Sequence, residues 1–204
     1  MKKILQTRAA PNPRRVRVFL AEKGLEVPFE ELDLMKGELK TAEFSHLNWF
    51  QRVPVLVLDD GTAIAETMAI CRYVEEIQPE PALFGKGPRG RAMVEMWNRR
   101  MELGLLLSVA QAFRHLHPAM AHLEVPQVAA WGEANKPRAL EIISFMDREL
   151  ATRPFIAGDE FSVADITALV AIDFMKPARI QRPAELKNLD RWYRDVSARP
   201  SATA

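Results

Sequence analysis

The stretch between residues 78 and 91 contains three prolines and three glycines, and it separates two halves of the chain that have different patterns. Before it, short apolar runs alternate with helical patterns, whereas only long helical patterns follow it. A segment of this composition is typical of a linker between domains. We therefore predict an α/β domain over residues 1–78, a linker over residues 79–90 and an all-helical domain over residues 91–204.

The first half contains apolar runs that are short enough to be strands. Asp60-Gly61, between the last two runs, favours a hairpin turn. The mostly polar stretch 36–47 predicts a short helix or a loop. A helix is expected to begin at Glu66-Thr67. The expected strands cover residues 3–7, 27–34, 53–58 and 62–65.

Two prolines flank Asn12 and mark the start of the first helix. Asn12 is a favourable N-cap, and Pro13 suits the first helical position, where no backbone donor is needed. Gly24 predicts the end of this helix, because glycine readily adopts the left-handed conformation found there. Arg14 and Arg15 fall in the first turn, where the helix dipole disfavours a cation, so we expect both to turn to solvent.

The second half carries a capping signal at its centre. Ser162 and Asp165 have the spacing of a capping box, and the residues after them are almost all apolar. This pattern predicts a helix that is buried in the middle of the domain. The other expected helices cover residues 91–116, 131–151 and 189–198.

Composition argues against several classes of protein. The chain has 28 Lys plus Arg and 27 Asp plus Glu, so it lacks the basic excess of a nucleic-acid-binding protein. It contains neither a membrane-spanning apolar run nor the apolar core of a signal peptide. Cys71, the only cysteine, cannot form an internal disulfide and is expected to be a small buried residue. We predict a cytoplasmic protein with no metal site and no nucleic-acid or membrane partner.

Four motifs, in this order, resemble those of the glutathione S-transferases. The resemblance spans nearly the whole chain and implies a thioredoxin-like first domain followed by the all-helical domain. It also implies that glutathione is the co-substrate, with no further cofactor, and that its thiol is conjugated to a hydrophobic electrophile. The motifs are residues 11–24, Val53-Pro54 before a strand, Glu66-Thr67 before a helix, and residues 162–165.

The expected catalytic residue is Asn12. Glutathione reacts as its thiolate, and because the pKa of a free cysteinyl thiol is about 8.5, the anion must be stabilised at neutral pH. Many family members use a Tyr, Ser or Cys, but the usual Ser position is Ala10 here. The Pro11-Asn12 pair is similar to that of the bacterial nu-type members, which use a Thr and an Asn. Asn12 would donate from the start of a helix, with plain helix capping as the alternative.

The resemblance also implies the other contacts of glutathione. Glu66 would pair with its ammonium group, and Thr67 would donate to the γ-glutamyl carboxylate. Arg52 or Gln51 would bind the glycyl carboxylate. The alternative is that Arg52 is an ordinary solvent-exposed loop residue. The backbone of Val53, beside a cis proline, would pair with the cysteinyl part. The expected contacts are Asn12, Gln51, Arg52, Val53, Pro54, Glu66 and Thr67.

The second substrate is expected between the first domain and the helix around residues 101–113. The residues expected to line its pocket are Leu105, Val109, Phe113 and Arg114. Transferases of this type pair through the first domain of one chain and the long helices of the other, so a homodimer is expected. Apolar residues on more than one face of the helix over residues 91–116 support this expectation: Met93, Met96, Trp97, Met101 and Leu105.

Two other functions fit the same motifs. Glutathione-dependent reduction of disulfides or peroxides is one, since the nu-type Pro11-Asn12 pair is present and the usual Ser or Tyr is not. A binding or assembly module without activity is the other, since a fold alone does not establish catalysis. The presence of Val53-Pro54 and Glu66-Thr67 favours a working glutathione site.

Overall fold

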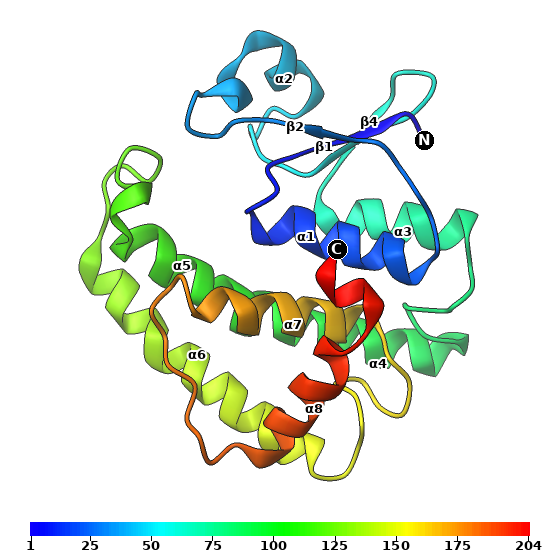
Figure 1. Cartoon of the computed structure of the whole chain (residues 1–204), viewed down its shortest axis with the longest axis vertical. Coiled ribbons are helices and arrows are strands. Elements are labelled where there is room, and N and C mark those ends of the chain that lie inside the picture. Colours follow the sequence, from blue (N-terminus) through cyan, green and yellow to red (C-terminus); the bar gives the residue numbers. More distant parts are fainter. The chain divides into compact units, whose positions relative to one another are not determined.

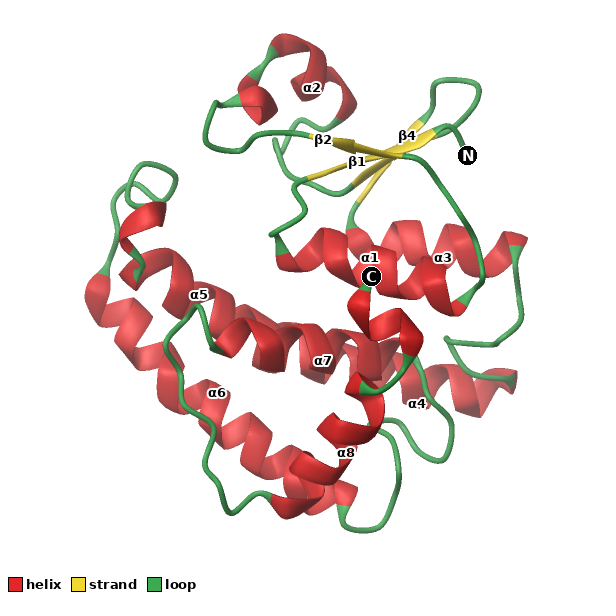
Figure 2. Ribbon diagram, viewed as in Figure 1, coloured by secondary structure: helices red, strands yellow, loops and turns green.

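The structure is a computed structural model that describes residues 1–204, and it divides into two compact units. The first unit contains residues 1–82 together with residues 200–204, and the second contains residues 83–199. All the named strands belong to the first unit, and the second is built of helices and loops (Figure 2). The predicted fold class, a thioredoxin-like α/β unit followed by helices alone, is confirmed. The return of residues 200–204 to the first unit was not evident from the sequence.

The first unit is built on a mixed sheet with the strand order β2-β1-β3-β4. β1 runs parallel to β2 and antiparallel to β3, which in turn runs antiparallel to β4. The carboxyl ends of β1, β2 and β4 therefore lie at the same end of the sheet as the amino end of β3. The strands are β1 (Lys3–Gln6), β2 (Phe29–Glu31), β3 (Val55–Val57) and β4 (Ala63–Ala65).

Helices cover both faces of this sheet. α1 (Pro11–Glu22) and α3 (Thr67–Ile77) lie side by side on one face (Figure 1). Against the other face, η1 (Glu38–Lys40) and α2 (Ala42–Leu47) contribute buried apolar side chains. Because side chains alternate along a strand, successive strand residues contribute to the cores on opposite faces of the sheet. The cluster on the α2 side is Leu5, Leu39, Phe44, Val55 and Val57.

The boundaries of α1 differ in part from the prediction. The N-cap is Ala10, which makes no side-chain capping bond, so Asn12 is a residue of the first turn and not the cap. Pro11, with its fixed φ, takes the first helical position that we had expected for Pro13. The C-terminus is as predicted, because Gly24 has a φ of +63° and the next N–H closes back onto the helix.

The last residues of the first unit pack on α1. They form a short 3₁₀ helix, η4 (Pro200–Thr203). Arg14 Nη2 donates to the carbonyl oxygen of Ala202 at 3.0 Å, and the Ser201 hydroxyl donates to Glu22. Arg14 is therefore held against η4 and does not simply turn to solvent as predicted.

The second unit begins with one long helix that changes its winding. α4 (Gly87–Arg99), η2 (Arg100–Leu106) and α5 (Leu107–Leu116) follow one another without a break. η2 is π-helical, and such a widened turn is often found near functional sites. The remaining helices are η3 (Pro118–Met120), α6 (Ala129–Leu150), α7 (Val163–Met175) and α8 (Lys187–Ser197).

α7 forms the centre of the second unit, as predicted, and it begins with the predicted capping box at Ser162 and Asp165. The carboxylate of Asp165 accepts hydrogen bonds from the backbone N–H groups of Ile156 and Ser162, the Ser162 hydroxyl and the Trp192 indole. Complete burial raises the pKa of Asp165, although each of these bonds acts in the opposite direction. The network ties the start of α7 to α8 and to the loop before α7.

Candidate glutathione site

Three candidate segments meet at one end of the sheet in the first unit. The register pairs Leu5 of β1 with Val55 of β3, and Val55 with Ala65 of β4. The loop to α1, the turn before β3 and the start of α3 therefore all extend from this end. The sheet thus brings together the neighbourhoods of Asn12, Val53 and Glu66, which are far apart in the sequence.

Asn12 is exposed in the first turn of α1, and Arg15 lies behind it. Arg15 is only 2% exposed, so the prediction that it turns to solvent is wrong. Its Nη1 donates to Oδ1 of Asn12 at 3.3 Å, and its Nη2 to the sulfur of Met68 in α3 at 3.0 Å. The sequence analysis missed this arrangement, although Arg15 follows Asn12 by the three residues that place two side chains on one helix face.

Thr7 precedes the loop to α1, and its hydroxyl is already hydrogen-bonded. It follows β1 directly, and its hydroxyl donates to the carbonyl oxygen of Leu32 at 2.8 Å. The buried Arg17 donates to the side chain of Gln6 at 2.6 Å and to the carbonyl oxygen of Arg8 at 3.1 Å. Burial and the neighbouring positive charge of Arg8 lower the pKa of Arg17.

Glu66 is the N-cap residue of α3 and has a φ of +70°, which only glycine adopts without strain. Its side chain is exposed, makes no capping hydrogen bond and has no ion-pair partner in the chain. Thr67, the first residue of α3, is buried, with its N–H at the free amino end of the helix. A strained junction thus presents a free carboxylate beside free helix donors.

The turn before β3 holds the other predicted contacts. The Val53–Pro54 peptide bond is cis, as the family resemblance implied. Neither the N–H nor the C=O of Val53 has a backbone partner. The Gln51 side chain donates to the Ser45 hydroxyl at 3.0 Å, whereas the exposed Arg52 side chain has no ion-pair partner in the chain.

The comparisons with known proteins agree over nearly the whole chain. The model of the glutathione S-transferase N-terminal domain matches residues 9–77, and that of the C-terminal domain matches residues 96–200. The chain belongs to the glutathione S-transferase family. It is therefore an enzyme that uses glutathione as its co-substrate, and the transferase reaction is favoured over the alternatives considered above.

Several relatives of this glutathione S-transferase are similar over most of their length. The chain is 41% identical over 201 residues to glutathione S-transferase 2 of Saccharomyces cerevisiae, covering 97% of this chain and 86% of that protein. The crystal structure of Gtt2 from S. cerevisiae matches with a TM-score of 0.94 at 40% identity, over 98% of both chains. A glutathione S-transferase domain-containing protein of Marinobacter aquaeolei gives 0.95 at 41% identity, again over 98% of both chains.

The residues expected to line the second-substrate pocket of this transferase lie in different surroundings. Leu105 and Val109 have no exposed surface in this structure and belong to the core of the second unit. Phe113 stacks on His117, and its ring centroid lies 4.9 Å from that of Phe174. Arg114 forms an ion pair with Glu124 at 2.5 Å. Phe113 and Arg114 therefore keep some accessible surface, whereas the two aliphatic residues do not.

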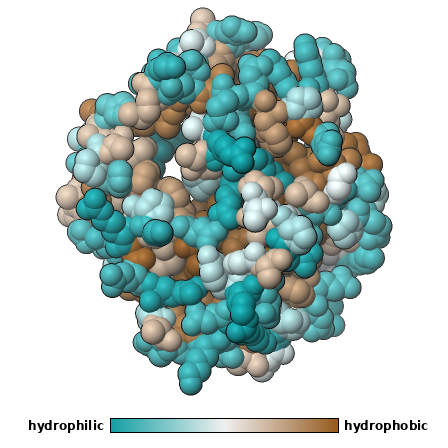
Figure 3. Space-filling model, viewed as in Figure 1, coloured by the Kyte–Doolittle hydropathy of each residue, from teal (hydrophilic) through white to brown (hydrophobic).

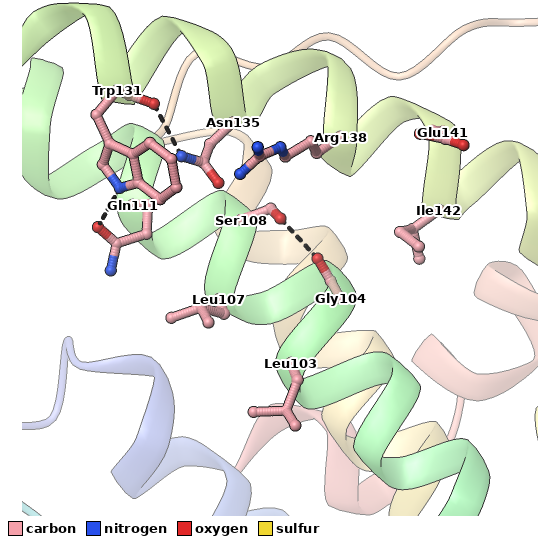
Figure 4. Close-up of a pocket in the computed structure, with 10 residues that line it drawn as sticks. All are labelled: Leu103, Gly104, Leu107, Ser108, Gln111, Trp131, Asn135, Arg138, Glu141 and Ile142. Carbon is pink, nitrogen blue, oxygen red and sulfur yellow. Dashed lines mark hydrogen bonds between the residues drawn. The ribbon is translucent and has the colours of Figure 1, made fainter.

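The second unit of the transferase carries an open groove of about 490 Å³ along the long helix. One wall is formed by η2 and α5 and the other by α6 (Figure 4). Leu103 and Leu107 are exposed apolar residues of the first wall. On the other, the Arg138 guanidinium lies over the Trp131 ring, whose indole N–H donates to Gln111 across the groove (Figure 4).

Two further findings bear on the predicted classes. The structure contains no group of three or more His, Cys, Asp and Glu side chains suited to a metal ion. None of its helices combines the length and the apolar character needed to cross a membrane. On the face in view in Figure 3, hydrophilic residues predominate and hydrophobic residues form smaller patches.

Proposed function

We propose that this glutathione S-transferase conjugates the thiol of glutathione to hydrophobic electrophiles, with Asn12 as the residue that stabilises the thiolate. The observation that carries this assignment is the hydrogen bonding of the Asn12 amide. Its oxygen accepts a hydrogen bond from the buried Arg15, so its Nδ2 group is left to donate elsewhere. Between Arg8 and Asn12, Ala9 and Ala10 have no polar side-chain atoms, and Pro11 lacks even a backbone donor.

Stabilising the thiolate requires only modest energy. A shift of one unit in the thiol pKa corresponds to about 1.4 kcal/mol, which a single charge-assisted hydrogen bond can supply. The backbone N–H of Asn12, the only donor among the first three residues of α1, and the dipole of that helix act in the same direction. We therefore expect Asn12 and the α1 backbone to share the stabilisation of the anion.

Glutathione would extend along the end of the sheet. The unpaired backbone of Val53 would bind its cysteinyl part as a short added strand. The free carboxylate of Glu66 would pair with the γ-glutamyl ammonium, and Thr67 would donate to the adjacent carboxylate. Arg52, which has no partner in the chain, would meet the glycyl carboxylate, with Gln51 beside it and Pro54 shaping the turn. This gives each charged group of glutathione a partner of opposite charge or a donor.

The test has two steps. Retention on immobilised glutathione, followed by elution with free glutathione, would exclude a module that has the transferase fold but no working glutathione site. Turnover would then be compared between an aryl halide and a mixed disulfide of glutathione. Conjugation of the aryl halide with negligible disulfide reduction supports the proposal, whereas the reverse ranking would make the protein a reductase. Cys71 is buried, so the reductase reaction would have to depend on glutathione alone.

We also expect a homodimer that works in the cytoplasm and removes toxic electrophiles. Both units carry exposed apolar side chains that a second copy could cover. Trp49 and Phe50 are 80% and 64% exposed before β3, and Leu103 and Leu107 line the groove of the second unit. Pairing of the first unit of one copy with the long helices of the other would bury both sets. The single, buried cysteine fits a reducing compartment.

A further inference from the structure

The geometry points to Arg15 as a positioning residue: its guanidinium holds the amide of Asn12 so that the Nδ2 group, and not the oxygen, faces the glutathione thiol. This inference rests on the proposed function of Asn12 and assigns a role to a residue behind it. The thiolate of glutathione accepts hydrogen bonds, so only the donor end of an amide can stabilise it. The orientation of the Asn12 amide therefore decides whether this side chain helps or hinders the reaction.

The chemistry of arginine fixes that orientation. A guanidinium carries five N–H donors and no acceptor, so the amide atom that faces it must be the oxygen. The Nη1–Oδ1 distance of 3.3 Å between Arg15 and Asn12 is at the long end of hydrogen-bond distances. Turning the amide would bring two donors together at this distance. Without Arg15, the exposed amide would be free to present either end to the thiol.

Arg15 is itself held firmly. It is 2% exposed between α1 and α3, and its second terminal nitrogen donates to the sulfur of Met68 at 3.0 Å. Met68 directly follows Thr67 at the start of α3, so the guanidinium also connects the two helix starts that would meet glutathione. A donor that is oriented in advance stabilises developing charge without first reorganising. Burial of Arg15 thus gives Asn12 a fixed direction.

The other charged groups nearby are directed elsewhere. Arg14 donates to the carbonyl oxygen of Ala202, and Arg17 donates to the side chain of Gln6. Arg15 is therefore the arginine of α1 that donates a hydrogen bond to Asn12. Arg8, Arg14 and Glu31 are the charged side chains that surround Arg17, and Glu66 is the charged residue at the start of α3.

The test measures the pKa of the thiol of bound glutathione, from thiolate absorbance against pH. Arg15→Gln introduces an acceptor and lets the Asn12 amide turn, so we expect the thiol pKa to rise by about one unit. At neutral pH, kcat should fall roughly fivefold to tenfold while KM for glutathione stays nearly the same. Arg15→Lys offers donors alone, keeps the amide orientation and should restore most of the shift. Arg14→Met, a neighbouring loss of positive charge, is the control and should leave the thiol pKa close to that of the wild type.

A double mutant separates positioning from a direct effect of the charge. If Arg15 acts through Asn12, Arg15→Gln should add little to the thiol pKa of an Asn12→Ala protein. An equal rise in both backgrounds, or no rise in Arg15→Gln, overturns the inference. Should Arg15→Gln fail to fold, Met68→Leu replaces it: loosening Arg15 should give a smaller rise, and an unchanged pKa would count against the role. A wild-type protein that does not bind glutathione, or an Asn12→Ala protein with an unchanged thiol pKa, would instead refute the proposed function.

Discussion

Replacing Glu66 by glutamine should weaken glutathione binding without affecting the fold. The carboxylate is exposed and has no partner in the chain, so its loss removes no internal interaction, and we expect the free energy of unfolding to stay within about 0.5 kcal/mol. Binding would lose one charged hydrogen bond to the γ-glutamyl ammonium, worth about 1.5–3 kcal/mol. Because the site is open to solvent, the lower value applies, which corresponds to a roughly tenfold rise in Kd.

A second variant, Glu66→Gly, tests the backbone strain at this position together with glutathione binding. Its φ of +70° costs a non-glycine residue about 1 kcal/mol or more, so glycine should raise the free energy of unfolding by about that amount. Glutathione affinity should fall at least as much as in the glutamine variant. Calorimetric titration with glutathione and urea unfolding measure the two quantities. Glu76→Gln, at the exposed far end of α3, is the matched control and should change neither.

The assignment of Glu66 would be refuted by a glutamine variant that binds glutathione as tightly as the wild type. A control variant that weakens binding equally would refute it too, because a long-range effect of net charge would then explain the loss. A glycine variant that is less stable than the wild type would show that the strain argument is wrong, whatever happens to binding.

Three further predictions concern other parts of the protein. Ser162→Ala removes the N-cap of α7, so it should lower the free energy of unfolding by about 1 kcal/mol and leave glutathione affinity unchanged. A loss of affinity without a change in the melting temperature would contradict this. Asn12→Ala should raise the thiol pKa of bound glutathione by about one unit and slow conjugation at neutral pH roughly tenfold, and superimposable titration curves would rule it out. Leu103→Lys combined with Leu107→Lys should shift the protein from dimer to monomer in sedimentation, because both side chains are exposed on the long helix. A wild-type protein that is already a monomer at micromolar concentration would contradict the expected dimer.

The sequence predicted those parts of the fold that local signals determine. Gly24 ends α1 because its conformation suits glycine, and Ser162 with Asp165 starts α7 because their spacing fits a capping box. The start of α1 was misplaced because two prolines surround Asn12 and each suits a first helical position. The structure starts the helix at the earlier one, after a cap residue without a polar side chain.

The candidate site was predictable only where the family resemblance supplied the roles. Glu66 and Val53 were assigned to the site through their motifs, but the positive φ of Glu66 has no signal in the sequence. Arg15 was missed because the dipole rule for first-turn cations is an average over exposed side chains. Its sulfur partner, Met68, lies 53 residues away, and a contact of that range arises only when α1 and α3 pack together.

The packing of residues 200–204 on α1 has a consequence for synthesis of the chain. A ribosome makes residues 1–82 first, but the segment that completes this unit emerges only after residues 83–199. During that interval Arg14 and Glu22 lack the partners that η4 later provides, so the nascent first unit should be more open to proteases than the finished one. The second unit is continuous and can fold in the meantime. Closure of the first unit thus has to wait until residues 200–204 have been synthesised, which happens only after the whole of the second unit.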